Sequence, residues 1–386
     1  MNYLTNKSKK ILYLCSMIRK TLLVLSLLAL FTSCDNDLNI IADWKDVPSV
    51  YGVLNAEDSV HYIKLNKAFL GQGDVMMMAQ EFDSLYYGED IVGLRLIKHE
   101  QNNNGEQSFT SIELETTDEF VKPEGIFNSP TQIIYKTSEE LYKDTFYALE
   151  VYRKSNDTII AQTENPIRVL SPVAFIKPNT ISALPIAPNS YVSKISWRRV
   201  EGGNMYEVSM RFNYIEFPIS GGSDTLYKSI EFDFPTLLSS DSEGGESMSY
   251  PIDYLQFLSF IAANIPNDPS VRRLTVGDGD RSSQGVSGFA ISHACLDFTL
   301  RAAGSDLSTY LVLNQNSSSL VLDRPEYSNI ENGVGILSSK TIDTVIGAKI
   351  TNSSNDEITT NELTKHLNFG SFELNGDNQI EITYEN

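Results

Sequence analysis

The sequence predicts a mainly β fold of two β-sandwich domains in tandem, the second with a mixed helical and loop insertion. Three observations predict it. Short runs of alternating apolar and polar residues recur from about residue 50 onward, with turn signals between them. The 386 residues are enough for two domains. A cluster of prolines marks a composition change that indicates an interdomain connection, at Pro172, Pro178, Pro185 and Pro188.

Composition argues against three classes of protein. Asp and Glu outnumber Lys and Arg by 50 to 30, which gives a formal charge of −20. Such a chain lacks the basic surface that binds phosphates, so we expect no nucleic-acid partner. Apolar residues make up 41% of the chain, too many for a disordered acidic tail and too few for a protein with many membrane spans.

Residues 1–33 have the pattern of a lipoprotein signal peptide. Two basic residues precede the apolar run 21–31, and small residues stand directly before Cys34. Residues 31–34 resemble the lipobox of bacterial lipoproteins. This resemblance implies a diacylglycerol and a palmitate on Cys34, which would anchor the chain to a membrane.

Translation that starts at Met17 would also give a complete signal peptide. The segment from Met17 to Cys34 is complete by itself, with its own basic residues and apolar run. Residues 1–16 are therefore open to interpretation as an upstream-start artefact.

Acidic residues follow the lipidation site in the predicted linker 34–49. Asp35 and Asp37 come directly after Cys34. By resemblance to proteobacterial lipoproteins, Asp35 would retain the chain at the inner membrane. By resemblance to Bacteroidota lipoproteins, the same acids would direct export to the cell surface. Solvated linker residues are the third interpretation. We favour export to the surface of the outer membrane.

The first predicted domain spans residues 50–170 and is a sandwich of immunoglobulin or transthyretin type. Alternation of period two predicts its strands, because such strands bury one face and expose the other. A turn at residues 155–157 predicts a hairpin. The predicted strands are 60–66, 91–98, 111–115, 146–152 and 158–161.

Two features of this domain are not strands. The run 75–82 predicts a short helix whose methionines pack softly and bind no metal. Tyr86 and Tyr87 stand beside a turn at Gly88, so we expect an exposed tyrosine pair able to contact a ligand.

The second predicted domain spans residues 171–350. Segments 192–197 and 205–214 resemble the second and third strands of a fibronectin type III sandwich, with Trp197 in the core. The insertion contains two predicted helices, 252–263, which ends near Asn264 and Pro266, and 306–313, capped by Ser305. Further strands are predicted at 229–234, 289–301 and 328–337.

Residues 351–386 form a predicted polar C-terminal tail, rich in Asn and Ser at its start. Apolar residues in the stretch 363–372 are expected to dock on the body of the protein.

Several weak motifs, taken in order, resemble a family of Bacteroidota outer-membrane lipoproteins whose shared domain has no assigned function. These are the lipobox at Cys34, then 51–54, 147–163, 195–197 with 206–208, and 329–336. The resemblance implies residence at the outer membrane and association with a TonB-dependent transporter. It supplies no catalytic residues.

Five Asp-Ser/Thr-aliphatic triplets resemble the sequon of periplasmic O-glycosylation in the same phylum. Coincidence is the alternative, since turns favour Asp followed by Ser or Thr. The hydroxyls concerned are Ser59, Ser84, Thr158, Thr225 and Thr344.

Cysteine and metal chemistry are weakly represented. Processing would leave Cys34 and Cys295, and because Cys34 would carry the lipid, no disulfide can form within the chain. Cys295 is expected to be a small buried hydrophobe, and a catalytic pair with His293 is disfavoured. Asp278 and Asp280 resemble the start of a calcium loop, but Phe289 stands where a carboxylate is needed. We expect no resident metal and no cofactor.

Two functional hypotheses remain. The first is a non-enzymatic surface lipoprotein that binds a transporter or a ligand through its β-sandwich loops and the insertion. The alternative is an extracellular hydrolase acting on glycans or peptides without a recognisable motif. Co-purification with an outer-membrane barrel supports the first, and turnover of a substrate panel supports the second.

Overall fold

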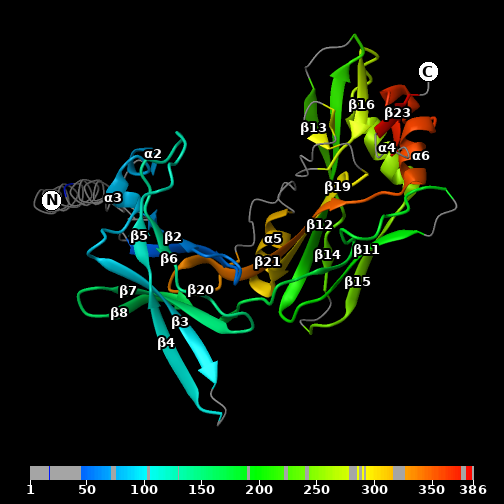
Figure 1. Ribbon diagram of the computed structural model, residues 1–386. Helices are drawn as coiled ribbons and strands as arrows, with labels where there is room; N and C mark the ends of the chain where they lie inside the picture. The colour runs from blue at the N-terminus through cyan, green and yellow to red at the C-terminus, as the bar shows by residue number, and fades with distance from the viewer. Residues whose placement is uncertain are drawn as a thin grey trace, which may run out of the picture. The chain divides into compact units, whose positions relative to one another are not determined.

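A computed structural model describes most of the chain (Figure 1). The described residues of 46–69 and 73–386 belong to one compact unit. The described residues are 17, 45–70, 75–101, 105–128, 130–188, 192–220, 225–239, 243–277, 285–286, 289–290, 293–315, 327–374 and 380–384.

The predicted mainly β fold is confirmed, and the largest sheet has ten strands among the described residues. Its order is β13 (Leu226–Asp233), β12 (Gly203–Pro218), β19 (Leu296–Gly304), β21 (Val334–Ala348), β1 (Lys45–Leu54), β2 (His61–Leu70), β6 (Ile134–Thr137) and β5 (Glu115–Thr117). Two short strands also pair with β12, namely β14 (Leu237–Leu238) and β16 (Val271–Thr275).

The other sheets of the described chain are smaller. One has the order β20 (Ile330–Glu331), β8 (Thr158–Thr163), β7 (Phe146–Arg153), β3 (Val92–Gln101) and β4 (Gln107–Glu113), with β9 (Ile167–Arg168) on β7. Another joins β10 (Phe175–Lys177), β11 (Ser193–Arg198) and β15 (Ser247–Ile252). Two-stranded ladders join β17 (Gly285–Val286) to β18 (Phe289–Ala290) and β22 (Ser371–Leu374) to β23 (Ile380–Thr383).

One hydrophobic cluster, here called the N-terminal core, lies between strands β1, β2 and β6 and strands β3, β7 and β8. Alternating residues of these strands are buried, as the period-two pattern predicts. Its members include Val50, Ile63, Tyr135, Leu94, Leu149 and Val151.

A second cluster, here called the C-terminal core, forms where β11 faces β12. Trp197 of β11 is fully buried, as predicted, and its ring lies 6.0 Å from that of Tyr206 and 6.1 Å from that of Tyr250. The two tyrosines come from β12 and β15. Because β11 and β12 belong to different sheets, this aromatic group joins the two layers.

Strand β21 pairs with two different strands, one over each half of its length. Its first half pairs in parallel with β1, from Ser49 opposite Val334 to Leu54 opposite Ser339. Its second half pairs antiparallel with β19, starting where Lys340 lies opposite Ala303. The predicted second domain thus contributes β20 and β21 to ladders with β8 and β1, strands of the predicted first domain. The division into two domains stays a prediction.

The helices agree with the sequence pattern in part. Helix α4 (Tyr254–Asn264) begins after Asp253, whose Oδ1 accepts from the amide of Gln256 at 2.9 Å. It ends at Asn264, as predicted. The expected helix at 75–82 is instead two single turns, α2 (Val75–Met78) and α3 (Phe82–Leu85). None of the described helices has the length and hydrophobicity to cross a bilayer.

The stretch predicted as a polar tail contributes to the C-terminal core. It contains α6 (Asn352–Thr360) and the short helix η1 (Lys365–Leu367). Ile358, Leu367 and Phe369 are buried in the cluster, which confirms the expected docking of 363–372. Thr351 caps α6 by accepting from the amide of Ser354.

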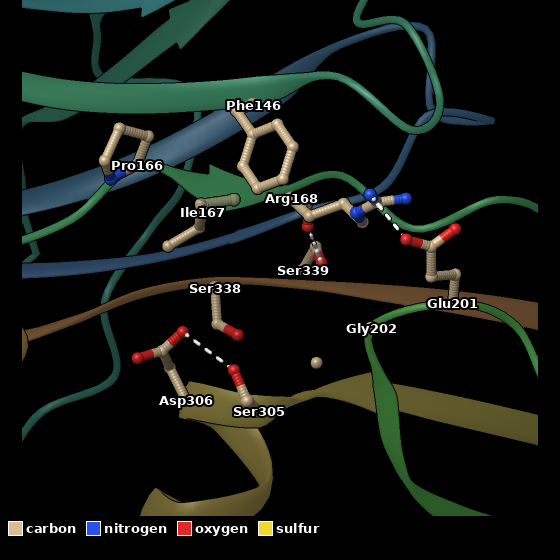
Figure 2. Close-up of a pocket in the computed structure, with 11 residues that line it drawn as sticks. Phe146, Pro166, Ile167, Arg168, Glu201, Gly202, Ser305, Asp306, Ser338 and Ser339 are labelled. Carbon is tan, nitrogen blue, oxygen red and sulfur yellow. Dashed lines mark hydrogen bonds and ion pairs between the residues drawn. The ribbon is translucent and has the colours of Figure 1, made fainter. Parts of the chain in front are cut away.

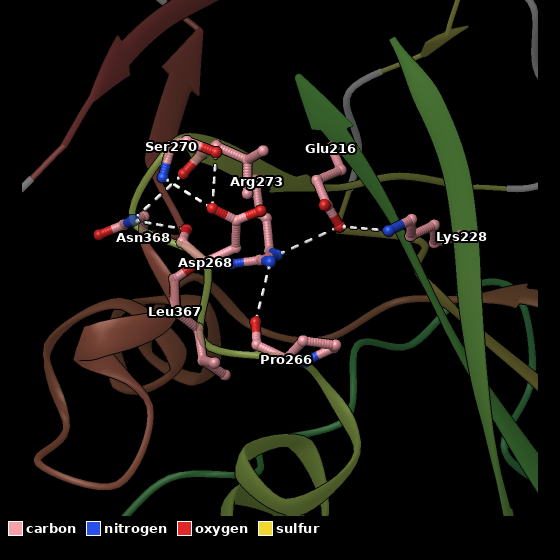
Figure 3. A network of polar contacts seen from close by, with 9 residues as sticks. Glu216, Lys228, Pro266, Asp268, Ser270, Arg273, Leu367 and Asn368 are labelled. Atoms are coloured by element: carbon pink, nitrogen blue, oxygen red, sulfur yellow. Dashed lines mark hydrogen bonds and ion pairs between the residues drawn. The ribbon is translucent and has the colours of Figure 1, made fainter. Parts of the chain in front are cut away.

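A buried arginine ties this segment to the sheet (Figure 3). Arg273 of β16 is 0% exposed, and its guanidinium donates to the carbonyls of Leu367 and Pro266, the latter at 3.0 Å. Its Nε lies 3.5 Å from Glu216 Oε2 of β12, which also pairs with Lys228 Nζ at 3.0 Å. Three chain segments therefore meet at one desolvated cation.

His61, the first residue of β2, is expected to make the protein acid-sensitive. It is 3% exposed, and neither ring nitrogen has a hydrogen-bond partner among the described residues. Burial lowers the pKa of His61, which the charge of Asp58 opposes. Below about pH 6.5 the unfolded chain binds a proton that the folded chain does not. Stability should therefore fall from about pH 6.5 down to the lowered pKa.

Urea unfolding of His61→Leu at neutral and acidic pH measures this contribution. We expect a smaller loss of unfolding free energy on acidification than in the parent protein. His366→Leu, at an exposed ring of η1, is the matched control. An equal acid response in parent and His61→Leu would contradict the interpretation.

Candidate functional site

The described chain has a pocket of about 300 Å³ where β21 changes partners (Figure 2). Ser338 and Ser339 form its floor, at the last pairing of β21 with β1. Both are 1% exposed. The walls come from β7 and β9, from the turn before β12, and from the start of α5 (Ser305–Gln315).

The floor serines hold two walls in place. Ser339 Oγ donates to the carbonyl of Arg168 at 2.6 Å, which fixes β9 over β21. Ser338 Oγ accepts from the amide of Leu307 at 3.0 Å. The first turn of α5 is thus capped by Ser338 from another strand, whereas Ser305, the predicted cap, is the first residue of the helix.

An arginine and its carboxylates form one rim of the pocket. Arg168 Nη2 lies 2.7 Å from Glu201 Oε1, and its Nη1 lies 3.4 Å from Asp144 Oδ1. The guanidinium carbon also lies 5.0 Å from the centre of the Phe146 ring, which is 41% exposed. The rim therefore offers a fixed cation beside an accessible aromatic face.

A further carboxylate, that of Asp306, lies on the opposite side of the pocket, as Figure 2 shows. Asp306 Oδ1 accepts from the hydroxyl of Tyr327 at 2.6 Å. Partial burial, and then this hydrogen bond, raise the pKa of Tyr327, so its hydroxyl stays a donor at neutral pH. Asp306 is therefore held as an oriented acceptor in the first turn of α5, where a negative charge is favourable.

Two glycines, Gly304 and Gly202, keep the pocket open because they have no side chain. A Cβ on Gly304 would lie 3.2 Å from Ser339 Oγ and 3.3 Å from Ser338 Oγ. Gly202 has φ +81°, a conformation that glycine adopts without strain, and a Cβ there would lie 3.2 Å from Arg168 Cδ. Side chains at either position would crowd the floor or the rim.

Several predicted site residues lie outside the described residues. These are the lipidation site Cys34, the sorting residues Asp35 and Asp37, and the weak calcium candidates Asp278 and Asp280. Within the described ranges, no group of three or more His, Cys, Asp or Glu residues is placed to hold a metal ion.

The expectation of an exposed tyrosine pair is wrong. Tyr86 is 2% exposed and Tyr87 is 4% exposed. Tyr86 packs on Phe82 with ring centres 4.7 Å apart, and the Tyr87 ring lies 5.0 Å from Lys67 Nζ. Both rings belong to the N-terminal core, because the chain around α3 turns them inward before the Gly88 turn.

The sequon hydroxyls differ in accessibility. Ser59, Thr158 and Thr344 belong to exposed residues, whereas Ser84 and Thr225 are partly buried. Thr225 Oγ1 itself has no access to solvent. Glycosylation stays a prediction, and Ser59, Thr158 and Thr344 are its accessible sites.

Cys295 is the small buried hydrophobe that the sequence predicts. It is 0% exposed within the C-terminal core, and burial raises the pKa of its thiol. A thiol of this kind is a poor nucleophile at neutral pH. Burial also lowers the pKa of the neighbouring His293.

Sequence reasoning did not identify the pocket. Its residues come from distant segments: Phe146, Arg168, Glu201, Asp306 and Ser338 lie on five different elements or turns. One local signal existed, the adjacent Ser338 and Ser339 directly after the apolar run 334–337. Two buried hydroxyls in a central strand must each find a partner, which points to a polar feature on that strand.

Comparison with known proteins adds little. No family model matches the chain, and no curated protein matches it. Among solved structures, the C-terminal globular domain of the oligosaccharyltransferase from Pyrococcus abyssi is similar at 11% identity and a TM-score of 0.17. The match covers 52% of this chain and 35% of that chain, so it spans about a third of the other protein. A similarity of this size carries no argument about fold or function.

Proposed function

We propose that the protein is a non-enzymatic lipoprotein of the outer membrane, exposed at the cell surface, which acts as an accessory or ligand-binding partner of a TonB-dependent transporter. The observation that carries the proposal is the segment from Met17 to Cys34, with its basic residues, apolar run and lipobox-like end. The acids Asp35 and Asp37 support export to the surface.

The pocket on β21 supports the ligand-binding part. Its volume of about 300 Å³ lies at the lower end of the range of small-molecule sites. Its lining combines one aromatic ring with several oriented polar groups, which suits a small polar ligand. Transfer of such a ligand to a barrel would be the accessory role.

Substitution of Cys34 tests the anchor. Cys34→Ala should abolish incorporation of a palmitate analogue and move the protein from the membrane fraction to the soluble fraction, because no acyl chain can be attached. Cys295→Ala is the matched control, and it should label and fractionate like the parent protein. Continued acylation of Cys34→Ala would refute the lipoprotein proposal.

Purification in mild detergent tests the partner. We expect an outer-membrane barrel to co-purify with the tagged parent protein, as identified by mass spectrometry, and not with Cys34→Ala. Protease treatment of intact cells tests the surface location, which Asp35→Ala combined with Asp37→Ala should reduce. Absence of any barrel from the parent preparation would overturn the accessory role.

A further inference from the structure

The pocket on β21 has a balance of charge that restricts its ligand. Glu201 and Asp306 carry two carboxylates into the lining, and Asp144 adds a third behind Arg168. These acids disfavour an anionic ligand. Arg168 already pairs with Glu201, and Asp306 lies at the positive end of the α5 dipole, so a cationic ligand would have to compete with these partners for the carboxylates. A neutral polar molecule meets neither penalty.

The accessible polar groups include both acceptors and donors. The carboxylates of Glu201 and Asp306 accept hydrogen bonds, and Arg168 donates them. The hydroxyl of Ser305 donates to Asp306 Oδ2 at 3.4 Å and keeps lone pairs that accept. Neighbouring hydroxyls on a ligand can donate to one group and accept from another, so a polyhydroxylated molecule matches the lining. The buried serines of the floor keep Arg168 and α5 in position.

Phe146 supplies the apolar part of the site. Its ring is 41% exposed, and the lining beside it includes Pro166 and Ile167. The face of an aromatic ring is electron-rich and attracts the polarised C–H groups of a sugar ring. The volume of about 300 Å³ corresponds to about ten water molecules, enough for one hexose ring and some of its waters.

We propose that this pocket binds one neutral hexose unit, stacked on Phe146 and hydrogen-bonded to Asp306, Glu201 and Arg168. The inference rests on the ligand-binding part of the proposed function and names its ligand class. A free sugar and the end of a glycan chain would present the same ring and hydroxyls to this pocket. The binding experiment below distinguishes these two sources.

Binding is measured on the detergent-solubilised full chain by saturation-transfer NMR and calorimetry. The probes are glucose, galactose and mannose, their methyl glycosides as models of chain ends, and glucuronic acid and glucosamine as charged counterparts. We expect at least one neutral sugar to bind at least about ten-fold more tightly than both charged sugars. Added salt should change its affinity by less than about two-fold. Preference for the glycoside would identify chain ends as the source, and preference for the free sugar would identify monosaccharides.

Two variants locate the site. Phe146→Ala should weaken binding about ten-fold or more, and Asp306→Asn should weaken it while leaving the fold intact. Phe109→Ala is the matched control, since Phe109 is an exposed ring, 59% accessible, on β4 outside the pocket.

The proposal is overturned if no neutral sugar binds, if the charged sugars bind as tightly, or if Phe109→Ala weakens binding as much as Phe146→Ala. Co-purification of the barrel is a separate result. A barrel that still co-purifies with a protein that binds no sugar refutes only the ligand class. Sugar binding without any barrel refutes only the accessory role.

Discussion

Arg273→Met is expected to lower the free energy of unfolding by about 3 kcal/mol or more. The guanidinium is fully buried and bonded to the carbonyls of Leu367 and Pro266. Methionine keeps much of the side-chain volume but leaves both carbonyls without their donor. It also leaves Glu216, which is 7% exposed, with only Lys228 as a counter-charge.

Urea unfolding followed by circular dichroism measures the loss, with Arg211→Met as the matched control. Arg211 lies on β12 like Glu216, but it is exposed. We expect the control to change stability by less than about 0.5 kcal/mol. If the two variants unfold at the same urea concentration, the buried cation does not hold the C-terminal segment to the sheet.

Gly335→Ala is expected to destabilise the protein by about 2–4 kcal/mol. Gly335 has φ +115°, and an added Cβ would lie 1.9 Å from the carbonyl oxygen of Val50. Val50 is its direct partner in the parallel ladder between β1 and β21. Relief of the clash would have to separate these strands or shift their register.

Gly125→Ala is the control for this substitution. An added Cβ at Gly125 has no atom within 4 Å, so its effect should stay below about 0.5 kcal/mol. Thermal unfolding of the two variants should differ clearly in midpoint. A Gly335→Ala protein with the parent midpoint would show that the contact with Val50 is relieved at little cost.

Sequence patterns correctly predicted the strands and helices that are determined by residues close together in the chain. Alternation predicted β2, β3 and β7, because each strand buries one face against a core. An apolar stripe that ends near Asn264 and Pro266 predicted α4. Trp197 is buried, as its resemblance to a core residue of a fibronectin type III sandwich implied.

Features with distant causes were not predicted. The parallel partner of β1 follows the insertion, and nothing in residues 45–54 or 334–339 specifies that pairing by itself. Tyr86 and Tyr87 were predicted to be exposed from the neighbouring turn, but tertiary packing decides where their rings point. The pocket was missed for the same reason, because only the fold brings Phe146, Arg168 and Asp306 together.

The position of β21 has a consequence for how the protein folds. A newly synthesised chain emerges from its N-terminus, yet the N-terminal core includes Ile330 and Leu337, and β1 pairs with a strand that emerges much later. The early part of the chain cannot complete its sheet until that late strand arrives. Such long-range pairing slows folding and leaves edge strands open in the meantime. Fragments that end before residue 334 should therefore aggregate, and chaperone protection during folding would be needed most for the N-terminal strands.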